Sequence, residues 1–171
     1  MRILGIDPGS IITGYGIIDM DGNQPRFVDA GCIRSGKGDF PARLRVIHNE
    51  INNLVVHQTP NEVAIEQVFL SRNADSALKL GQARAAAICG TFARDQNDEQ
   101  LALFEYAARE VKQAVVGKGG AAKEQVQHMV KVILSLRETP QPDAADALAV
   151  ALCHGFNRIA RQRIAQVTKS S

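Results

Sequence analysis

The order in which strand-like and helix-like patterns follow one another constrains the fold of this chain most strongly. The first 35 residues contain three short runs of strand-forming residues, over 3–6, 13–20 and 26–33. The first run is separated from the second by Pro8, Gly9 and Ser10, and the second from the third by the turn pair Asp21-Gly22. This pattern predicts a three-stranded antiparallel meander at the start of the domain.

The remainder of the chain alternates helices with single strands. Apolar residues recur at helical spacing over 41–57, and the short apolar run 62–66 follows. Because crossover connections are right-handed, 62–66 should form a strand parallel to a strand of the meander. The later pattern predicts a helix from Asn73 to about Ala93 with Asn73 or Ser71 as N-cap, a strand over 101–104, and helices over 106–116, 121–136 and from Pro142 to about Phe156. The predicted fold class is therefore α/β, a mixed five-stranded sheet with helices on both faces.

Length and composition are those of one ordinary globular domain. The chain has 171 residues, of which 45% are hydrophobic and 22% charged, so we expect one domain over 1–157 and a basic tail over 158–171 whose order is left open. Cys32, Cys89 and Cys153 lie far apart and show no metal or disulfide spacing, which indicates a reducing compartment. No run is long and apolar enough to predict a membrane span or a signal peptide, so the expected location is cytoplasmic, with no membrane partner.

Charge is unevenly distributed along the chain. Residues 109–131 carry five basic and two acidic side chains, and 155–171 carry four basic side chains and no acidic one. Since the net charge is only +2, the rest of the chain is acidic. This distribution suggests a polyanionic partner facing a carboxylate-rich site, and solvated helix faces with a frayed tail are the alternative.

Four carboxylates occupy positions that are hard to explain structurally: Asp7, Glu66, Asp143 and Asp146. Asp7 and Glu66 end two apolar strands that should be neighbours, about 4.8 Å apart. Asp143 and Asp146 are three residues apart on a helix that is otherwise apolar all round. Such a cluster needs a cation, and all-oxygen ligands favour Mg²⁺ or Mn²⁺. The alternatives are a helix-dipole role for Asp143, a turn role for Asp7 and a lysine partner for Glu66.

Other chemistries have weaker support. The segment around Gly117-Lys118 lacks the upstream glycine and the hydroxyl of a P-loop, and Gly14-Tyr15-Gly16 lacks the third glycine of a dinucleotide loop. The four histidines have no metal-ligand spacing and are expected at the surface or satisfied in the core: His48, His57, His128 and His154. Cys153 and His154 are adjacent on a helix, so they point in different directions and form no nucleophile pair.

Several sequence blocks resemble the RuvC family of bacterial Holliday-junction resolvases. They are GIDPGS at 5–10, TGYG at 13–16, AIEQVF at 64–69, NADSALKLGQAR at 73–84, VKQ at 111–113 and DAADAL at 143–148. The resemblance implies a ribonuclease-H-like fold, a homodimer and paired, Mg²⁺-dependent nicking of opposite strands at a four-way DNA junction, in recombination and repair. It also implies two Mg²⁺ ions per site, with Mn²⁺ able to substitute, and work alongside the branch-migration proteins RuvA and RuvB.

The same resemblance assigns roles to residues. Asp7, Glu66, Asp143 and Asp146 correspond to the catalytic, metal-binding carboxylates. Phe69 corresponds to an aromatic residue that probes bases, although by itself the sequence favours a core position. Lys112 and Lys123 correspond to basic residues near the cut strand. From the residues themselves, Lys118 among glycines before a helix is a phosphate-contact candidate, with a flexible connection as the alternative.

The sequence departs from the family pattern at two places, and two other functions remain as alternatives. Ala85 stands where the family block continues with glycine, and the loop around 94–100 is longer than usual. The rivals are a phosphotransferase of the actin and sugar-kinase type, because residues 5–10 also resemble its phosphate loop, and a non-catalytic junction-binding module. The preferred cutting sequence is not predictable from these residues.

Overall fold

The computed structural model describes residues 1–67, 73–92 and 101–169, with 161–169 as backbone alone. Its five strands are β1 (Arg2–Asp7), β2 (Ile12–Asp21), β3 (Gln24–Arg34), β4 (Glu62–Glu66) and β5 (Ala102–Tyr106). Its five helices are α1 (Phe40–Gln58), α2 (Ala74–Gly90), α3 (Ala108–Val116), α4 (Lys123–Ile133) and α5 (Pro142–Lys169). The order along the chain is the one expected from the sequence.

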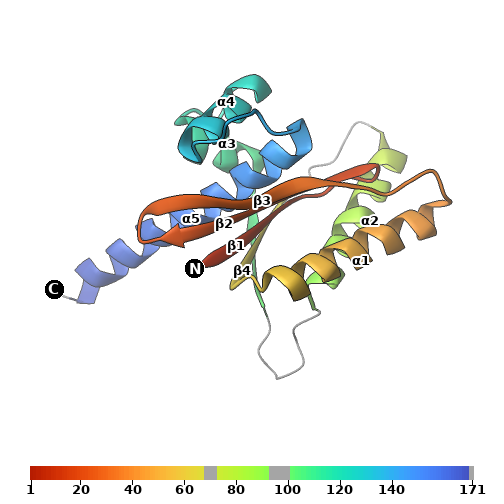
Figure 1. Ribbon diagram of the computed structural model, residues 1–171, viewed down its shortest axis with the longest axis horizontal. Helices are drawn as coiled ribbons and strands as arrows, with labels where there is room; N and C mark the ends of the chain where they lie inside the picture. The colour runs from red at the N-terminus through yellow and green to blue at the C-terminus, as the bar shows by residue number, and fades with distance from the viewer. Residues whose placement is uncertain (68–72, 93–100, 170–171) are drawn as a thin grey trace.

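The strands form one mixed sheet in the order β3-β2-β1-β4-β5. The meander β1–β2–β3 is antiparallel, whereas β4 is parallel to both β1 and β5. Helices α1 and α2 cover one face, and α3, α4 and α5 cover the other (Figure 1). The predicted α/β class with helices on both faces is therefore confirmed, and each face encloses its own hydrophobic core.

Several predicted element ends are wrong. Tyr106 is the last residue of β5 rather than the start of α3, because it pairs with Glu66 in the sheet. Helix α2 ends at Gly90, where the Thr91 hydroxyl donates a hydrogen bond to the Ile88 carbonyl (2.7 Å). The predicted end of this helix, Ala93, and the loop around 94–100 lie outside the described residues.

Helices α4 and α5 also differ from the prediction. Helix α4 begins at Lys123 because the Gln125 side chain accepts the backbone N–H of Ala122, and it ends before Ser135, whose φ is +51°. Helix α5 continues past Phe156 to Lys169, since residues 157–169 contain no glycine or proline, and its end extends beyond the sheet (Figure 1). Of the helices described here, none is long and apolar enough to cross a membrane.

Candidate active site

Asp7 and Glu66 lie side by side on the sheet face that α5 covers. Their strands alternate strictly, with Leu4, Ile6, Val63 and Ile65 packed toward α1 and α2. Strands β1 and β4 are parallel and pair Ile6 with Ile65, so the next residues are Asp7 and Glu66 on the opposite face. The predicted juxtaposition of these two strand ends is confirmed.

Three glycines allow α5 to lie directly on the sheet. Gly5 and Gly16 are paired across β1 and β2, and Asp7 is paired with Gly14. A Cβ atom at Gly5 would collide with the Ala147 carbonyl, and one at Gly16 would lie 2.7 Å from the Leu148 nitrogen. Because a helix cannot approach a strand this closely over larger residues, the glycines set the depth of α5.

This close approach brings the acidic end of α5 to Asp7. The Asp143 carbonyl lies against Gly14, the residue paired with Asp7. Asp143 and Asp146 are half-buried, whereas residues 144, 145 and 147–153 of the same helix are buried. Two carboxylates from the helix and two from the strands therefore converge at one end of the sheet, as the sequence predicts.

The pKa values of Asp7 and Glu66 report this convergence. Burial, together with the negative charges of Glu66, Asp146 and Asp143, raises the pKa of Asp7 from 3.8 to about 8. Burial and the charge of Asp146 also raise the pKa of Glu66, against an opposing effect from Lys112 and Lys123. The site is thus a negative cluster that its lysines compensate only in part, which favours either protons or a cation.

Two lysines line the same cavity as Glu66 and Asp146. The cavity has a volume of about 240 Å³, and its polar lining residues are Glu66, Asp146, Lys112 and Lys123. Lys123 Nζ is 2.7 Å from Asp146 Oδ2, and this hydrogen bond raises the pKa of Lys123 although burial opposes it. The structure therefore joins two predicted DNA-contact residues to two predicted metal ligands.

The four carboxylates have the oxygen donors that a hard divalent cation prefers, but they are too far apart to hold one ion together. All four offer oxygen donors, and burial together with the neighbouring carboxylates raises the pKa of Asp7. Within residues 1–67, 73–92 and 101–160, however, no three acidic, histidine or cysteine side chains are close enough to hold one ion. Asp146 Oδ2 is already hydrogen-bonded to Lys123 Nζ at 2.7 Å.

The remaining predicted contact residues lie elsewhere. Lys118 is exposed in the connection between α3 and α4, where Gln113 binds Gly117 and Gly119, and it is not among the residues that line the cavity. Phe69 falls within residues 68–72 and lies outside the described residues.

One supporting group has no local signal in the sequence. The buried Ser35 hydroxyl donates to the carbonyls of Ser10 and Ile11 (both 3.1 Å), and Arg43 donates to Ser35 and to the Ser10 carbonyl. These bonds fix the loop that follows Asp7. Ser35 and Arg43 lie far from Asp7 in sequence, so no motif reveals their role.

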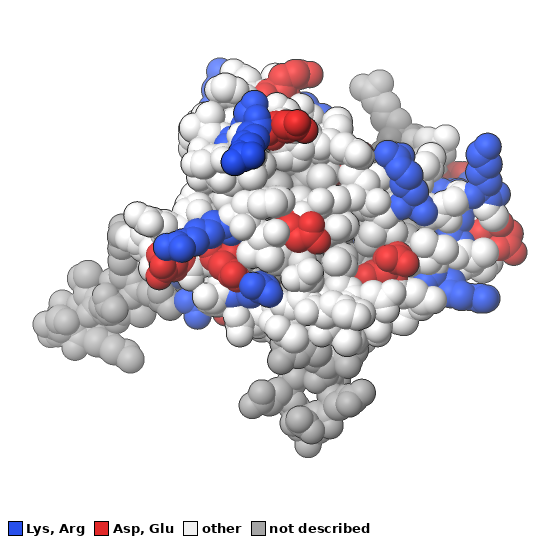
Figure 2. Space-filling model, in the orientation of Figure 1, with Lys and Arg blue, Asp and Glu red and all other residues white. Residues whose placement is uncertain are grey.

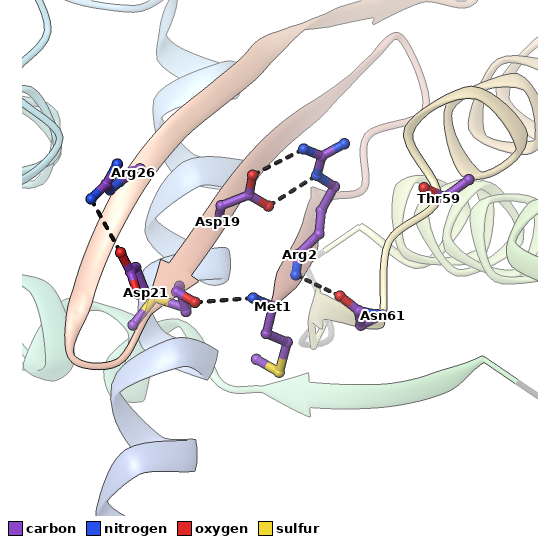
Figure 3. A pocket seen from close by; sticks show the side chains of 8 residues that line it. Met1, Arg2, Asp19, Asp21, Arg26, Thr59 and Asn61 are labelled. Carbon is purple, nitrogen blue, oxygen red and sulfur yellow. Dashed lines mark hydrogen bonds and ion pairs between the residues drawn. The ribbon is translucent and has the colours of Figure 1, made fainter.

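A second, larger hollow at the opposite end of the sheet differs in character (Figure 3). It has a volume of about 620 Å³, but its acidic residues are already paired. Asp19 binds Arg2 at 2.9 Å, and Asp21 binds Arg26 at 3.1 Å. Acidic side chains there are neutralised, in contrast to Asp7 and Glu66.

A mixed sheet with carboxylates at the ends of its central strands, and a helix that adds two more, places this protein among the ribonuclease-H-like nucleases. The family described as "Crossover junction endodeoxyribonuclease RuvC" matches residues 3–154. This chain belongs to that family and is an endodeoxyribonuclease. This membership decides against the phosphotransferase and the non-catalytic module.

Individual relatives agree over most of the chain. A crossover junction endodeoxyribonuclease RuvC from Edwardsiella ictaluri is 55% identical over 152 residues, which cover 89% of this chain and 85% of the relative. One from Hahella chejuensis is 49% identical over 170 residues, covering 99% and 96%. The solved structure of Thermus thermophilus RuvC with a Holliday junction substrate covers 94% of this chain and 96% of its own, with a TM-score of 0.84 and 33% identity. The yeast mitochondrial resolvase Ydc2, at 13% identity and a TM-score of 0.67, shares the fold.

Proposed function

We propose that this chain resolves four-way DNA junctions by hydrolysing one phosphodiester in each of two opposite strands. The observation that carries the proposal is the cavity in which Glu66 and Asp146 lie with Lys112 and Lys123. The Thermus thermophilus relative was solved in complex with a Holliday junction substrate, which supports the same substrate here.

The four carboxylates are proposed to hold the metal. Asp7, Glu66, Asp143 and Asp146 would bind Mg²⁺, with Mn²⁺ able to substitute, and two ions per site would suit a phosphodiester displacement. When bound, such ions activate a water molecule and stabilise the leaving oxygen. Asp7 must lose the proton that its raised pKa retains near neutral pH, so cation binding and proton release are linked.

The lysines are proposed to position the DNA. Lys123 is paired with Asp146 in the protein without DNA, and when a cation takes that carboxylate the ammonium group becomes available to a phosphate. Lys112 lines the same cavity and opposes the rise in the pKa of Glu66, so it too lies where the cut strand would pass. Lys118 would contact a phosphate further out, and Phe69 would stack on a base at the junction.

A homodimer is proposed because one carboxylate cluster serves one phosphate at a time. Helix α2 offers a surface for it, since Leu78 is 67% exposed and Gly81, Ala85 and Cys89 are exposed on the same side. Following the family resemblance, we also propose that the dimer works in the cytoplasm with RuvA and RuvB.

Incubation with a labelled four-way junction and Mg²⁺, with a linear duplex of the same sequence as control, tests the proposal. We expect paired cuts in opposite strands of the junction and no cutting of the duplex. Equal cutting of both substrates, or no cutting in Mg²⁺ or Mn²⁺, would refute it.

A further inference from the structure

His154 lies outside the candidate active site, and within the described residues it makes polar contacts with neither the site's four carboxylates nor its two lysines. It is 1% exposed, and its Nε2 is 2.6 Å from Glu62 Oε2. Its Nδ1 is 2.8 Å from the Tyr106 hydroxyl, and its ring lies 4.4 Å from that of Phe104. With a proton on Nε2, the neutral ring donates to Glu62 and accepts from Tyr106, so both nitrogens are satisfied.

Glu62 holds this arrangement from the sheet. Its second oxygen accepts a hydrogen bond from Arg158 Nε at 3.2 Å. Burial alone would raise the pKa of Glu62, but the hydrogen bonds from His154 and Arg158 outweigh burial and lower it. Glu62 is thus an ionised acceptor that binds α5 at two points, one turn apart.

The spacing along the two elements matches. Glu62 and Glu66 are four residues apart at the two ends of β4, a distance of about 13 Å in a strand. Asp146 and His154 are eight residues apart on α5, about 12 Å along a helix. Since Glu66 and Asp146 line one cavity and His154 binds Glu62, α5 runs antiparallel to β4 with both pairs in register.

The other polar contacts of α5 lie near the ends of the interface: Arg158 Nε donates to Glu62 Oε1 at 3.2 Å, and Arg34 Nη2 donates to Gln141 Oε1, just before the helix, at 3.3 Å. Gly5 and Gly16 set how closely the helix approaches. The buried residues between Asp146 and His154 are aliphatic or sulfur-containing, and apolar contacts are not directional. A short, buried hydrogen bond to a charged acceptor is directional.

We propose that His154 is a positioning residue that sets the placement of α5 along β4, and thereby the separation of Asp146 from Glu66. The inference rests on the proposed nuclease function. Its effect on cleavage follows because metal ligands and reacting groups displaced by about 1 Å lose about 100-fold in rate.

Four variants test this placement. His154→Phe keeps an aromatic ring beside Phe104 but cannot bond Glu62, whereas His154→Gln keeps both a donor and an acceptor. Leu152→Ala is the matched control, because Leu152 is a fully buried residue of α5 whose loss weakens packing without removing a polar contact. Glu62→Leu removes the same bond from a side chain that is 17% exposed, and it replaces His154→Phe should that variant not fold.

We expect the single-turnover rate of junction cleavage to fall by about 10-fold or more in His154→Phe, with junction affinity in Ca²⁺ nearly unchanged. His154→Gln should recover most of the rate, and Leu152→Ala should keep it. Parental cleavage by folded His154→Phe would overturn the proposal, as would an equal loss in Leu152→Ala.

Crystal structures separate this inference from the proposed function. In His154→Phe we expect Asp146 to shift along the α5 axis relative to Glu66, and in Leu152→Ala no such shift. If the parent protein fails to cut junctions, the proposed function falls while the crystallographic comparison still decides the positioning role. An unmoved α5 in His154→Phe would overturn it.

Discussion

Asp7 is the carboxyl group at which burial and like charge act together. Its strand is buried, so the side chain loses solvation, and Glu66, Asp146 and Asp143 add negative potential. Lys123 opposes this, but it is shared with Asp146. The protein without metal therefore stores unfavourable electrostatic free energy at the position proposed to bind a cation.

The first prediction concerns stability against pH without metal. The pKa of Asp7 is about 8 in the folded protein against an ordinary 3.8, so between these values the folded state holds a proton that the unfolded chain has released. In EDTA, the free energy of unfolding should fall as pH rises from 5 to 8, and Asp7 should contribute at most about 1.4 kcal/mol per unit to this fall. Asp7→Asn should flatten this slope in denaturant titrations. The exposed carboxylate change Asp21→Asn should not, and equal slopes in the parent and Asp7→Asn would contradict the argument.

The second prediction separates DNA binding from chemistry. Asp7→Asn, Glu66→Gln, Asp143→Asn and Asp146→Asn each remove one negative charge and keep the side-chain shape. Cleavage in Mg²⁺ should fall by orders of magnitude, whereas junction affinity without metal should stay level or rise, because less negative charge faces the phosphates. Ca²⁺ should support binding with little cutting. Asp21→Asn is the control, and parental cutting by Asp146→Asn would remove the helix carboxylates from the mechanism.

The packing of helix α5 on strands β1 and β2 assembles the site. The helix contributes Asp143 and Asp146, and its depth is set by glycines at 5, 14 and 16. A glycine in a strand usually weakens that strand, but here it allows two backbones to touch. The site therefore depends on residues that carry no functional group.

A third prediction follows from this contact. In Gly16→Ala, the added Cβ would lie 2.7 Å from both the Leu148 nitrogen and its Cγ, so α5 must move outward. We expect a loss of about 1–3 kcal/mol in the free energy of unfolding together with reduced cleavage. Gly120→Ala is the control, because a Cβ there meets no atom within 4 Å, and it should change stability by less than about 0.5 kcal/mol. Urea titration of both variants makes the comparison, and equal stability would refute the packing argument.

The elements are more predictable from the sequence than their ends. The order of strands and helices, the pairing of β1 with β4 and the buried face of α5 follow from periodicity and chain connectivity. The local pattern places Tyr106 in a helix, because its pairing with Glu66 and its bond to His154 are long-range contacts. The extension of α5 beyond Phe156 could have been predicted, since residues 157–169 contain no glycine or proline.

The carboxylates could be predicted and their surroundings could not. A buried strand end or an apolar helix makes an acidic residue conspicuous in sequence. The Lys123–Asp146 pair, the support of the Asp7 loop by Ser35 and Arg43, and the bond between His154 and Glu62 join segments separated by at least 20 residues. Such contacts depend on the packed fold rather than on any local pattern.

Charge over the face of the molecule shown in Figure 2 is mixed. Figure 2 shows basic side chains over α3 and α4 and at the end of the molecule where β3 leads into α1, with acidic side chains between them. Affinity for DNA should therefore depend on a few well-placed lysines rather than on one extended basic field.

The fourth prediction uses the salt dependence of junction binding. Lys112→Ala and Lys123→Ala should each reduce cleavage and make the log–log salt slope shallower by about 0.9. Arg26→Ala is the control, because Arg26 pairs with Asp21 at the far end of the sheet (Figure 3). Binding isotherms at several salt concentrations measure the slope. If both lysine variants keep the parental slope and rate, these lysines are ordinary surface charges.

The fifth prediction concerns the proposed homodimer, which would allow paired cutting of opposite strands. A two-fold dimer presents two copies of the carboxylate cluster to a junction that is itself nearly two-fold. Leu78 on α2 is 67% exposed. The space over Gly81, one turn further along, is open, because a Cβ added there would meet no atom within 4 Å. A second helix can therefore approach this surface. Leu78→Glu should place two like charges at this contact and raise the dimer dissociation constant, whereas Val56→Glu, at a 50% exposed position on α1, should not.

Sedimentation at micromolar concentration, free and on a junction, distinguishes the two variants. A parent protein that remains monomeric under both conditions would exclude the dimer, and a Leu78→Glu variant that dimerises like the parent would exclude α2 as its interface.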